Sequence, residues 1–201
     1  MIDKDSTCIQ WLLEDDNPAV KYRTQTEFLG QPADKAPVLE WLNAFLPTDW
    51  TSRTGLWSRY YITAFAECGL SCTDIPLDKE AIIGFGRAFS FEHNCADYMH
   101  LRALVKLGLA DEPTVAEIIR HLPERQLPDG GFLCLHRVDK LKRIPKSCVK
   151  ANMYALMFCA ECKKRDIGTD IEQPIRYGRQ GYLERYSVQV LFTERTVRQA
   201  G

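Results

Sequence analysis

The chain has 201 residues, 45% of them hydrophobic, which is enough for one ordinary domain and too short for two. It carries 26 Lys and Arg against 27 Asp and Glu, so its formal net charge of -1 gives no global attraction to nucleic acid or to an anionic membrane. No apolar run approaches the roughly 20 residues that span a bilayer, and the acidic start is unlike a secretory signal. We therefore expect a soluble, cytoplasmic protein with residues 1–201 in a single domain and its eight cysteines reduced.

Apolar residues recur at helical spacing along most of the chain, and no stretch keeps the alternation of a half-buried strand, so the predicted fold class is all-α. Ser6 or Thr7 is expected to cap a first helix, and Asn17 a second helix that begins at Pro18 and ends at Gly30. Seven more helices are predicted at about 37–45, 56–68, 77–89, 96–107, 113–126, 148–163 and 171–185. The irregular segment 127–146 is long enough that we look there first for function.

Two types of helix recur along the sequence, which is typical of arrays of helical hairpins. The start at 16–20 recurs at 111–115, each time with a proline near the first helical position. The segment 64–70 recurs at 103–109 and, more loosely, at 155–160. Helices of this second kind carry few charges, so those near Leu56, Ala96 and Cys148 are expected to be buried on most sides. Helices near Val38 and Val115 have a charged face and should lie outside.

Two sequence motifs accompany this alternation of outer and inner helices. One is Gln126-Leu127-Pro128-Asp129-Gly130-Gly131-Phe132, and the other is Trp11-Leu12-Leu13-Glu14-Asp15-Asp16-Asn17-Pro18. With the repeat, they resemble terpenoid cyclases and protein prenyltransferases, including small bacterial members. The resemblance implies an α/α toroid. A closed toroid in that family has about six hairpins and this chain supplies about four, so we expect antiparallel helical hairpins in a partial, open α/α toroid.

The catalytic acid motifs of the resembled family are incomplete in this sequence. Leu13 stands at the first aspartate of the Asp-x-Asp-Asp acid, before Asp15 and Asp16. Ala19 stands at the third aspartate of the Asp-Asp-x-x-Asp magnesium site. We therefore interpret Glu14-Asp15-Asp16 as a solvated turn between helices.

Three cysteines and a histidine form a candidate metal site. Cys95 and Cys148 hold nearly equivalent places in the repeat, at the starts of two inner helices, and in a toroid such starts converge at one end. Cys134 and His136 lie in the loop that leads to Cys148. Three thiolates and an imidazole suit tetrahedral zinc, which is the expected cofactor. Burial as small residues is the alternative, because it is the commonest fate of free cysteine.

The resemblance adds an expectation for that metal. Prenyltransferases hold a catalytic zinc at the toroid mouth with Asp, Cys and His, although this sequence lacks their Asp-x-Cys motif. His93 and His100 are reserve ligands near Cys95. Cys159 and Cys162 lie inside an apolar helix and are interpreted as core residues, and Cys8 as part of the first apolar stripe.

The loop after His136 is basic. It holds Arg137, Lys140, Lys142, Arg143 and Lys146 against one carboxylate, Asp139. These five residues are candidates for binding an anion, and the resemblance implies a diphosphate near the toroid mouth. A solvated loop explains the same charges and is the simpler interpretation. No aromatic side chains are interleaved with them, so we expect no nucleic-acid binding.

Two functions remain open. In the first, a concave aromatic face binds a partner or a second copy, and any metal is structural. In the second, the chain is a small isoprenoid-handling enzyme with a zinc or diphosphate site. We prefer the binding module, because the acid motifs and the prenyltransferase ligand motif are missing. The expected partners are an apolar or isoprenoid-like small molecule and a protein, with a homo-oligomer as the simplest case.

Overall fold

The computed structural model describes residues 6–52, 56–87, 95–127, 131–132 and 147–168. The described residues form helices joined by turns, with no strand among them, so the all-α prediction is confirmed. The chain divides into two compact units. Unit 1 comprises residues 1–88 and 103–109, and unit 2 comprises residues 89–102 and 110–201. No helix in the described ranges combines the length and the apolar character that crossing a bilayer requires.

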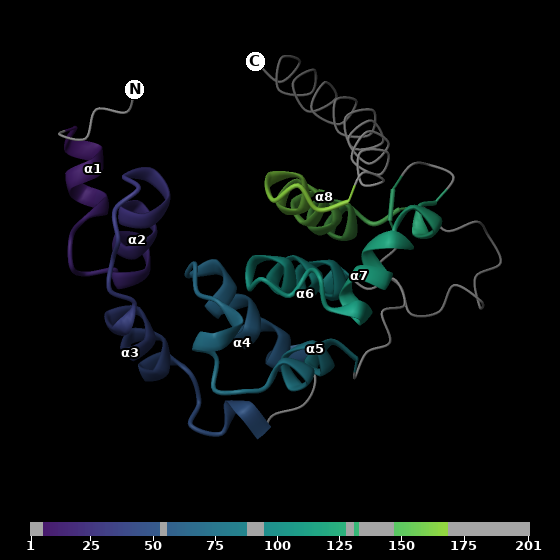
Figure 1. Cartoon of the computed structure of the whole chain (residues 1–201), viewed down its shortest axis with the longest axis horizontal. Coiled ribbons are helices and arrows are strands. Elements are labelled where there is room, and N and C mark those ends of the chain that lie inside the picture. The colour runs from purple at the N-terminus through teal and green to yellow at the C-terminus, as the bar shows by residue number, and fades with distance from the viewer. Residues whose placement is uncertain (1–5, 53–55, 88–94, 128–130, 133–146, 169–201) are drawn as a thin grey trace, which may run out of the picture. The chain divides into compact units, whose positions relative to one another are not determined.

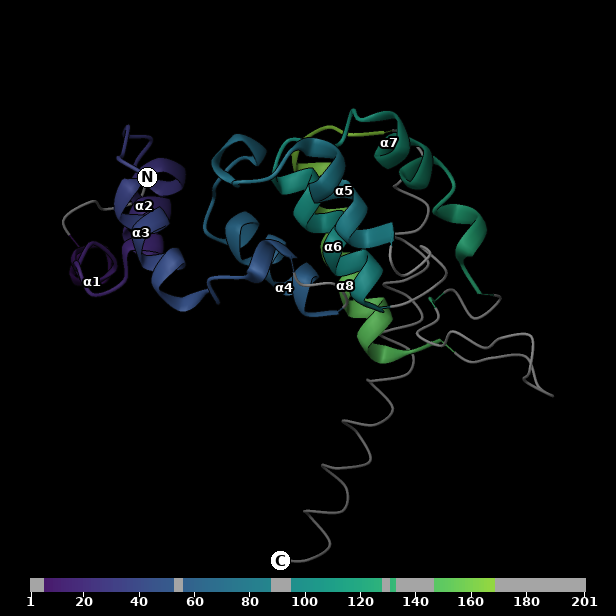
Figure 2. The same ribbon diagram turned by 90° about the horizontal axis from the view of Figure 1, so that it is seen from below.

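The N-terminal helices of unit 1 begin where local capping chemistry predicts. Helix α1 spans Thr7–Leu12, and the Ser6 side chain accepts a hydrogen bond from the Ile9 amide at 3.4 Å. Helix α2 spans Pro18–Arg23, and Asn17 Oδ1 accepts from the Val20 amide at 3.2 Å. Helix α2 runs into a π-helical turn, Thr24–Phe28, which the sequence did not predict. Helix α3, Ala36–Phe45, lies beside α2 in both Figure 1 and Figure 2.

The remaining described helices begin within two residues of the predicted positions, and α7 ends six residues earlier than predicted. Helix α4 spans Leu56–Glu67, α5 spans Lys79–Arg87, and α6 spans Cys95–Lys106. Helix α7 spans Pro113–Arg120 and is followed by a short 3-10 turn at Pro123–Arg125. Helix α8 spans Val149–Lys164 and lies beside α6 (Figures 1 and 2). The predicted helix 171–185 falls outside the described residues.

The helix ends of α4 and α6 repeat the same geometry, as their sequence repeat predicts. The Leu70 amide donates to the Phe65 carbonyl at 3.2 Å, and the Leu109 amide to the Leu104 carbonyl at 2.9 Å. Between them, Gly69 and Gly108 adopt φ angles of +80° and +82°. Both helices therefore end in a Schellman motif, in which a left-handed glycine turns the chain away.

Helix α8 ends in a third copy of this turn, at a different register from the predicted one. The Ile167 amide donates to the Cys162 carbonyl at 3.0 Å, and Asp166, with φ of 56°, takes the place of the left-handed glycine. Asp166 is thus the counterpart of Gly69, whereas the sequence comparison placed Ala160 there. The error has a simple cause: α8 continues beyond the position at which the shorter α4 ends.

Helix α6 is the most deeply buried helix among the described residues. Nine of its twelve residues are buried, including Asp97 and His100. Helices α3 and α7 bury only one narrow face each, formed by Val38 and Leu42 in α3 and by Val115 and Ile119 in α7. This contrast agrees with the predicted division into inner and outer helices. The open toroid stays a prediction.

The core of unit 1 includes an aromatic cluster. The Trp50 ring lies 5.5 Å from the Phe65 ring and 5.9 Å from the Tyr61 ring, measured between centroids. Trp50 and Phe65 are buried. Their contacts are those of ordinary core packing, with edge and tilted geometries that aromatic pairs prefer.

Candidate functional site

The two described members of the predicted metal set lie at helix starts, as expected. Cys95 is the first residue of α6, and Cys148 is the N-cap of α8. Both are half-buried and both belong to unit 2. Cys134 and His136 lie outside the described residues, as does the reserve ligand His93. Within the described ranges, no three His, Cys, Asp or Glu side chains gather into a group that could hold a metal ion.

The structure does not describe the five basic residues of the predicted anion site. Arg137, Lys140, Lys142, Arg143 and Lys146 all fall in segment 133–146, outside the described residues. The zinc and diphosphate predictions both stay predictions.

The Gln126–Phe132 motif fixes the start of α8. The Phe132 amide donates to Asn152 Oδ1 at 2.6 Å, and the Cys148 amide donates to the Phe132 carbonyl at 2.9 Å. Asn152 Nδ2 in turn donates to Ser147 Oγ at 3.2 Å. These bonds hold Cys148 at the entrance of the helix.

Gly131 packs against Ser147 and Asn152 at the start of α8, which is possible because glycine has no side chain. A Cβ there would lie 2.5 Å from Ser147 Oγ and 2.8 Å from Asn152 Nδ2, and it would overlap the Ser147 Cβ. No ordinary side chain fits between these groups. The second glycine of the motif is therefore explained by packing against α8.

Phe132 also joins α6 to this arrangement. Its ring is buried, and its centroid lies 5.3 Å from that of Tyr98 in an edge-to-face contact. Tyr98 follows Cys95 by three residues, so one aromatic residue connects the helix starts that carry Cys95 and Cys148. Sequence analysis missed Ser147 and Asn152. The available signal was Asn152, a polar residue among the apolar residues of a predicted inner helix, together with Ser147 just before that helix.

The remaining described cysteines separate into buried and accessible thiols. Burial raises the pKa of Cys159 and of Cys162 to about 12, and each has a neighbouring acidic group that adds to the effect, Cys162 for Cys159 and Glu161 for Cys162. Both are therefore protonated core residues, as predicted. Cys8 is exposed, so its assignment to the apolar stripe of the first helix was wrong.

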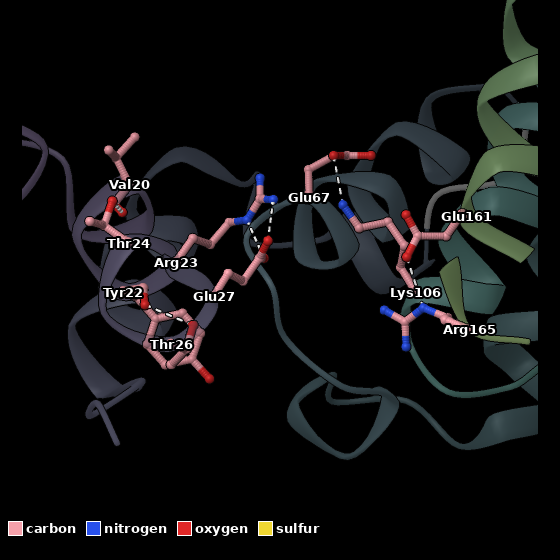
Figure 3. Close-up of polar contacts among 10 residues, drawn as sticks. All are labelled: Val20, Tyr22, Arg23, Thr24, Thr26, Glu27, Glu67, Lys106, Glu161 and Arg165. Atoms are coloured by element: carbon pink, nitrogen blue, oxygen red, sulfur yellow. Dashed lines mark hydrogen bonds and ion pairs between the residues drawn. The ribbon is translucent and has the colours of Figure 1, made fainter. Parts of the chain in front are cut away.

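Unit 1 contains a polar cluster at the ends of α4 and α6, shown in Figure 3. Lys106 Nζ lies 2.8 Å from Glu67 Oε2, and its side chain is only 8% exposed. Arg23, the last residue of α2, pairs with Glu27 of the π-helical turn at 2.7 Å. Burial raises the pKa of the neighbouring Cys68 thiol, against the lowering effect of Arg23 and Lys106. The Cys68 thiol therefore stays protonated at neutral pH and is a poor nucleophile. We interpret the cluster as structural.

A hollow of about 490 Å³ lies on unit 1 between α2 and the approach to α3. It is lined by Asp15, Pro18, Lys21, Tyr22, Gln25, Pro32, Ala33, Asp34 and Pro37. Asp15 at its edge pairs with Lys21 at 2.5 Å, and that hydrogen bond lowers the pKa of Asp15. Asp34 accepts from the Ala36 amide at 2.9 Å. Both carboxylates of the lining thus already have partners within the protein.

Large apolar side chains project from unit 1 into solvent. Trp11 is 66% exposed, Phe28 57% and Phe45 71%. The Trp41 ring packs against Phe45 with its centroid 4.9 Å away. These aromatics lie on α1, the π-helical turn and α3.

Comparison with known proteins does not assign a class to this arrangement. No family model matches the chain, and no curated protein or solved structure matches it either.

Proposed function

We propose that the chain is a helical-repeat protein, similar to terpenoid cyclases and prenyltransferases, that acts as a binding module. The observation that supports this best is the exposure of Trp11, Phe28 and Phe45 on unit 1. Exposed apolar patches on soluble proteins often mark interaction sites, and aromatic residues are favoured anchors in protein interfaces.

The simplest partner for these exposed aromatic side chains is a second copy of the chain. An apolar or isoprenoid-like molecule is the second occupant, because such a ligand would pack on the same side chains. Either one would remove apolar area from water, which is the main favourable term in association.

Light scattering on the purified chain tests the proposal. We expect the mass to rise above 23.1 kDa with increasing concentration, and Trp11→Ser with Phe45→Ser to reduce that rise. Gln10→Ser is the matched control, because Gln10 is an exposed polar residue beside Trp11 on α1. A chain that stays at 23.1 kDa at high concentration would contradict self-association, and titration with a prenyl alcohol would then test the apolar ligand.

A metal site is the second candidate, supported by the positions of Cys95 and Cys148 at two helix starts. Helix N-termini favour thiolates, the form that binds zinc. With Cys134 and His136 they would form a closed site of three sulfurs and one nitrogen, with distances of about 2.3 Å and about 2.0 Å to the metal. An open fourth position would instead favour the enzyme, with a diphosphate held by Arg137, Lys140, Lys142, Arg143 and Lys146.

Elemental analysis after exchange into metal-free buffer tests this candidate. Cys95→Ser and Cys148→Ser should each lower the zinc content and the melting temperature, because metal binding contributes to folding free energy. Cys8→Ser should change neither, since Cys8 is exposed and distant in the sequence from the set. Wild-type protein that retains no zinc would overturn the metal site.

A further inference from the structure

Helix α8 carries an apolar stripe on its exposed side. Val149 is 44% exposed, Met153 43% and Met157 38%, and the three residues are spaced by four. Ala160, which is also exposed, continues the same line along the helix, and we call these four residues the α8 stripe. The opposite side of α8 is buried. Because a helix that is apolar all round is normally covered all round, the stripe is a candidate contact surface.

Positive charge borders the α8 stripe. The other residues that α8 exposes are Lys150, Lys163 and Lys164. Lys164 follows Ala160 by four residues, so it lies one turn beyond the end of the stripe. The one acidic residue of α8, Glu161, is buried and pairs with Arg165 at 2.8 Å. The exposed side of α8 is therefore apolar and basic, and the surface that fits it is apolar and acidic.

The N-terminal part of unit 1 has the opposite charge. Residues 6–49 carry seven acidic side chains against three basic ones. Each of the three basic side chains is paired with a carboxylate, Lys21 with Asp15, Arg23 with Glu27 and Lys35 with Asp74. This part of the protein is therefore acidic, although the whole chain is nearly neutral.

Trp11 and the turn that follows it combine an exposed aromatic ring with acidic charge. The Trp11 side chain is 66% exposed. The Glu14 amide donates to the Trp11 carbonyl at 3.3 Å, so Glu14 lies one turn beyond Trp11, and Glu14 and Asp16 are both exposed. We call Trp11, Glu14 and Asp16 the α1 patch. It has the same order as the α8 stripe, an apolar side chain followed one turn later by a charge, but the sign of the charge is opposite.

The charges decide which surfaces of two copies fit together. Two α8 stripes packed on each other would bring lysines of both copies together, and two α1 patches would do the same with carboxylates. The α1 patch packed on the α8 stripe instead brings Glu14 and Asp16 toward Lys164. It also places Trp11 on Met153 and Met157, whose thioethers make favourable contacts with aromatic rings. Of the three pairings, the unlike one covers apolar side chains on both copies and brings opposite charges together.

We propose that the α8 stripe of one copy binds the α1 patch of a second copy, head to tail. This contact rests on the proposed function, because it names the surface that receives Trp11 when the chain self-associates. Each dimer formed in this way has one α1 patch and one α8 stripe still unused, so further copies can add. The assembly should therefore grow beyond a dimer as the concentration rises.

Mixing two variants tests the contact by light scattering. Trp11→Ser and Met153→Glu/Met157→Glu should each weaken self-association about tenfold or more, because each variant lacks one of the two surfaces. An equimolar mixture of them should form a dimer and nothing larger, since only the α1 patch of one variant and the α8 stripe of the other are intact. Variants that had misfolded would not recover on mixing, so the recovery also checks their folding.

Two matched controls accompany the mixture. Gln10→Ser changes an exposed residue beside Trp11 on α1. Arg120→Glu adds negative charge at an exposed position of α7, in the same unit as α8. Both control variants should associate as the wild type does.

A charge exchange tests the electrostatic part of the contact. Glu14→Lys/Asp16→Lys and Lys164→Glu should each weaken association, because each brings like charges together. Their mixture should associate again, since the basic α1 patch of one variant then meets the acidic end of the α8 stripe of the other. Raising the salt concentration to about 0.5 M should weaken the wild-type contact, because salt screens exposed charges.

The results that would overturn this contact differ from those that would overturn the proposed function. Association that Trp11→Ser weakens and Met153→Glu/Met157→Glu leaves unchanged would preserve self-association and exclude the α8 stripe. Two weakened variants whose mixture stays monomeric would exclude the head-to-tail arrangement. Wild-type chain that stays at 23.1 kDa at high concentration would overturn both proposals. Cosedimentation of that chain with phosphatidylserine vesicles, lost in Met153→Glu/Met157→Glu, would then assign the stripe to a membrane surface.

Discussion

Glu67 and Lys106 form an ion pair between equivalent positions of two repeats. Each is the last residue of its helix, Glu67 of α4 and Lys106 of α6, and each precedes the same Schellman turn. Their side-chain atoms lie 2.8 Å apart, with Lys106 8% exposed and Glu67 38% exposed (Figure 3). The sequence repeat that places two helix ends in register thus also places opposite charges in contact. Lys106 is nearly buried, so its ammonium group depends on this partner.

The first prediction concerns this pair. Glu67→Gln should lower the free energy of unfolding by about 1–2 kcal/mol, because it leaves the ammonium of Lys106 with a weaker partner in a shielded place. Lys106→Met should have a smaller effect, because it removes the charge and keeps an apolar stem. Urea unfolding measures both. The control is Glu27→Gln, which breaks the more exposed pair with Arg23 and should change stability by less than about 1 kcal/mol. Equal effects of Glu67→Gln and Glu27→Gln would contradict the argument.

The second prediction compares glycine-to-alanine substitutions at three positions. It distinguishes the cost of a left-handed backbone conformation from the cost of steric crowding around the new Cβ. Gly108→Ala should destabilise by about 1–2 kcal/mol, since its φ of +82° is left-handed and a Cβ would meet nothing within 4 Å. Gly69→Ala should destabilise more, because a Cβ would also lie 3.2 Å from Arg23 Cγ. Gly84→Ala, inside α5 with open space around it, should stabilise by about 0.5–1 kcal/mol. Thermal unfolding gives the order, and a destabilising Gly84→Ala would count against it.

The third prediction concerns the start of α8. Gly131→Ala and Asn152→Ala should each destabilise unit 2 by at least about 2 kcal/mol, the first by overlap with Ser147 and the second by stranding the buried Phe132 amide. Hydrogen exchange at the Cys148 and Phe132 amides should speed up in both variants. Met153→Ala, on the exposed side of the same helix, is the control. Unchanged exchange in Asn152→Ala would show that its carbonyl does not hold the loop.

The fourth prediction is a pH dependence at Asp74. Burial raises the pKa of this carboxyl, but hydrogen bonds from Lys35 and Ser71 outweigh burial and hold the pKa below the ordinary value of an aspartate. A carboxyl with a depressed folded-state pKa contributes stability above its unfolded pKa, and this contribution is lost as the pH falls through the folded value. Asp74→Asn should therefore destabilise the protein at pH 6 and have a smaller effect at pH 3. Melting temperatures at the two pH values measure this, and equal losses at both would contradict it.

Local features of the fold were predictable from the sequence, because caps and prolines act over a few residues. Ser6, Asn17, Pro18 and Pro113 start helices where expected. The repeat of 64–70 at 103–109 predicted two equivalent helix ends. The looser third repeat failed in register, since α8 is longer and Asp166 replaces glycine.

Contacts between distant residues were not predictable in the same way. Nothing local to Glu67 identifies Lys106 as its partner, 39 residues away. For the candidate site, the sequence predicted the helix-start positions of Cys95 and Cys148, but it missed Asn152, whose role depends on a loop 20 residues earlier. A side chain that accepts a hydrogen bond from a backbone amide far away in the sequence leaves no periodic pattern in the sequence that would reveal this role.

The π-helical turn at Thr24–Phe28 acts as a phase shift in the chain. The Leu29 amide donates to the Thr24 carbonyl, five residues back instead of four, so one extra residue is inserted into the helical path. Every residue after the turn is rotated by about 100° relative to a continuous α-helix that lacked this residue. The outward direction of Phe28 is thus set by a count of residues, and loss of a single residue between Thr24 and Phe28 would turn this exposed ring to another side of the helix without changing its chemistry.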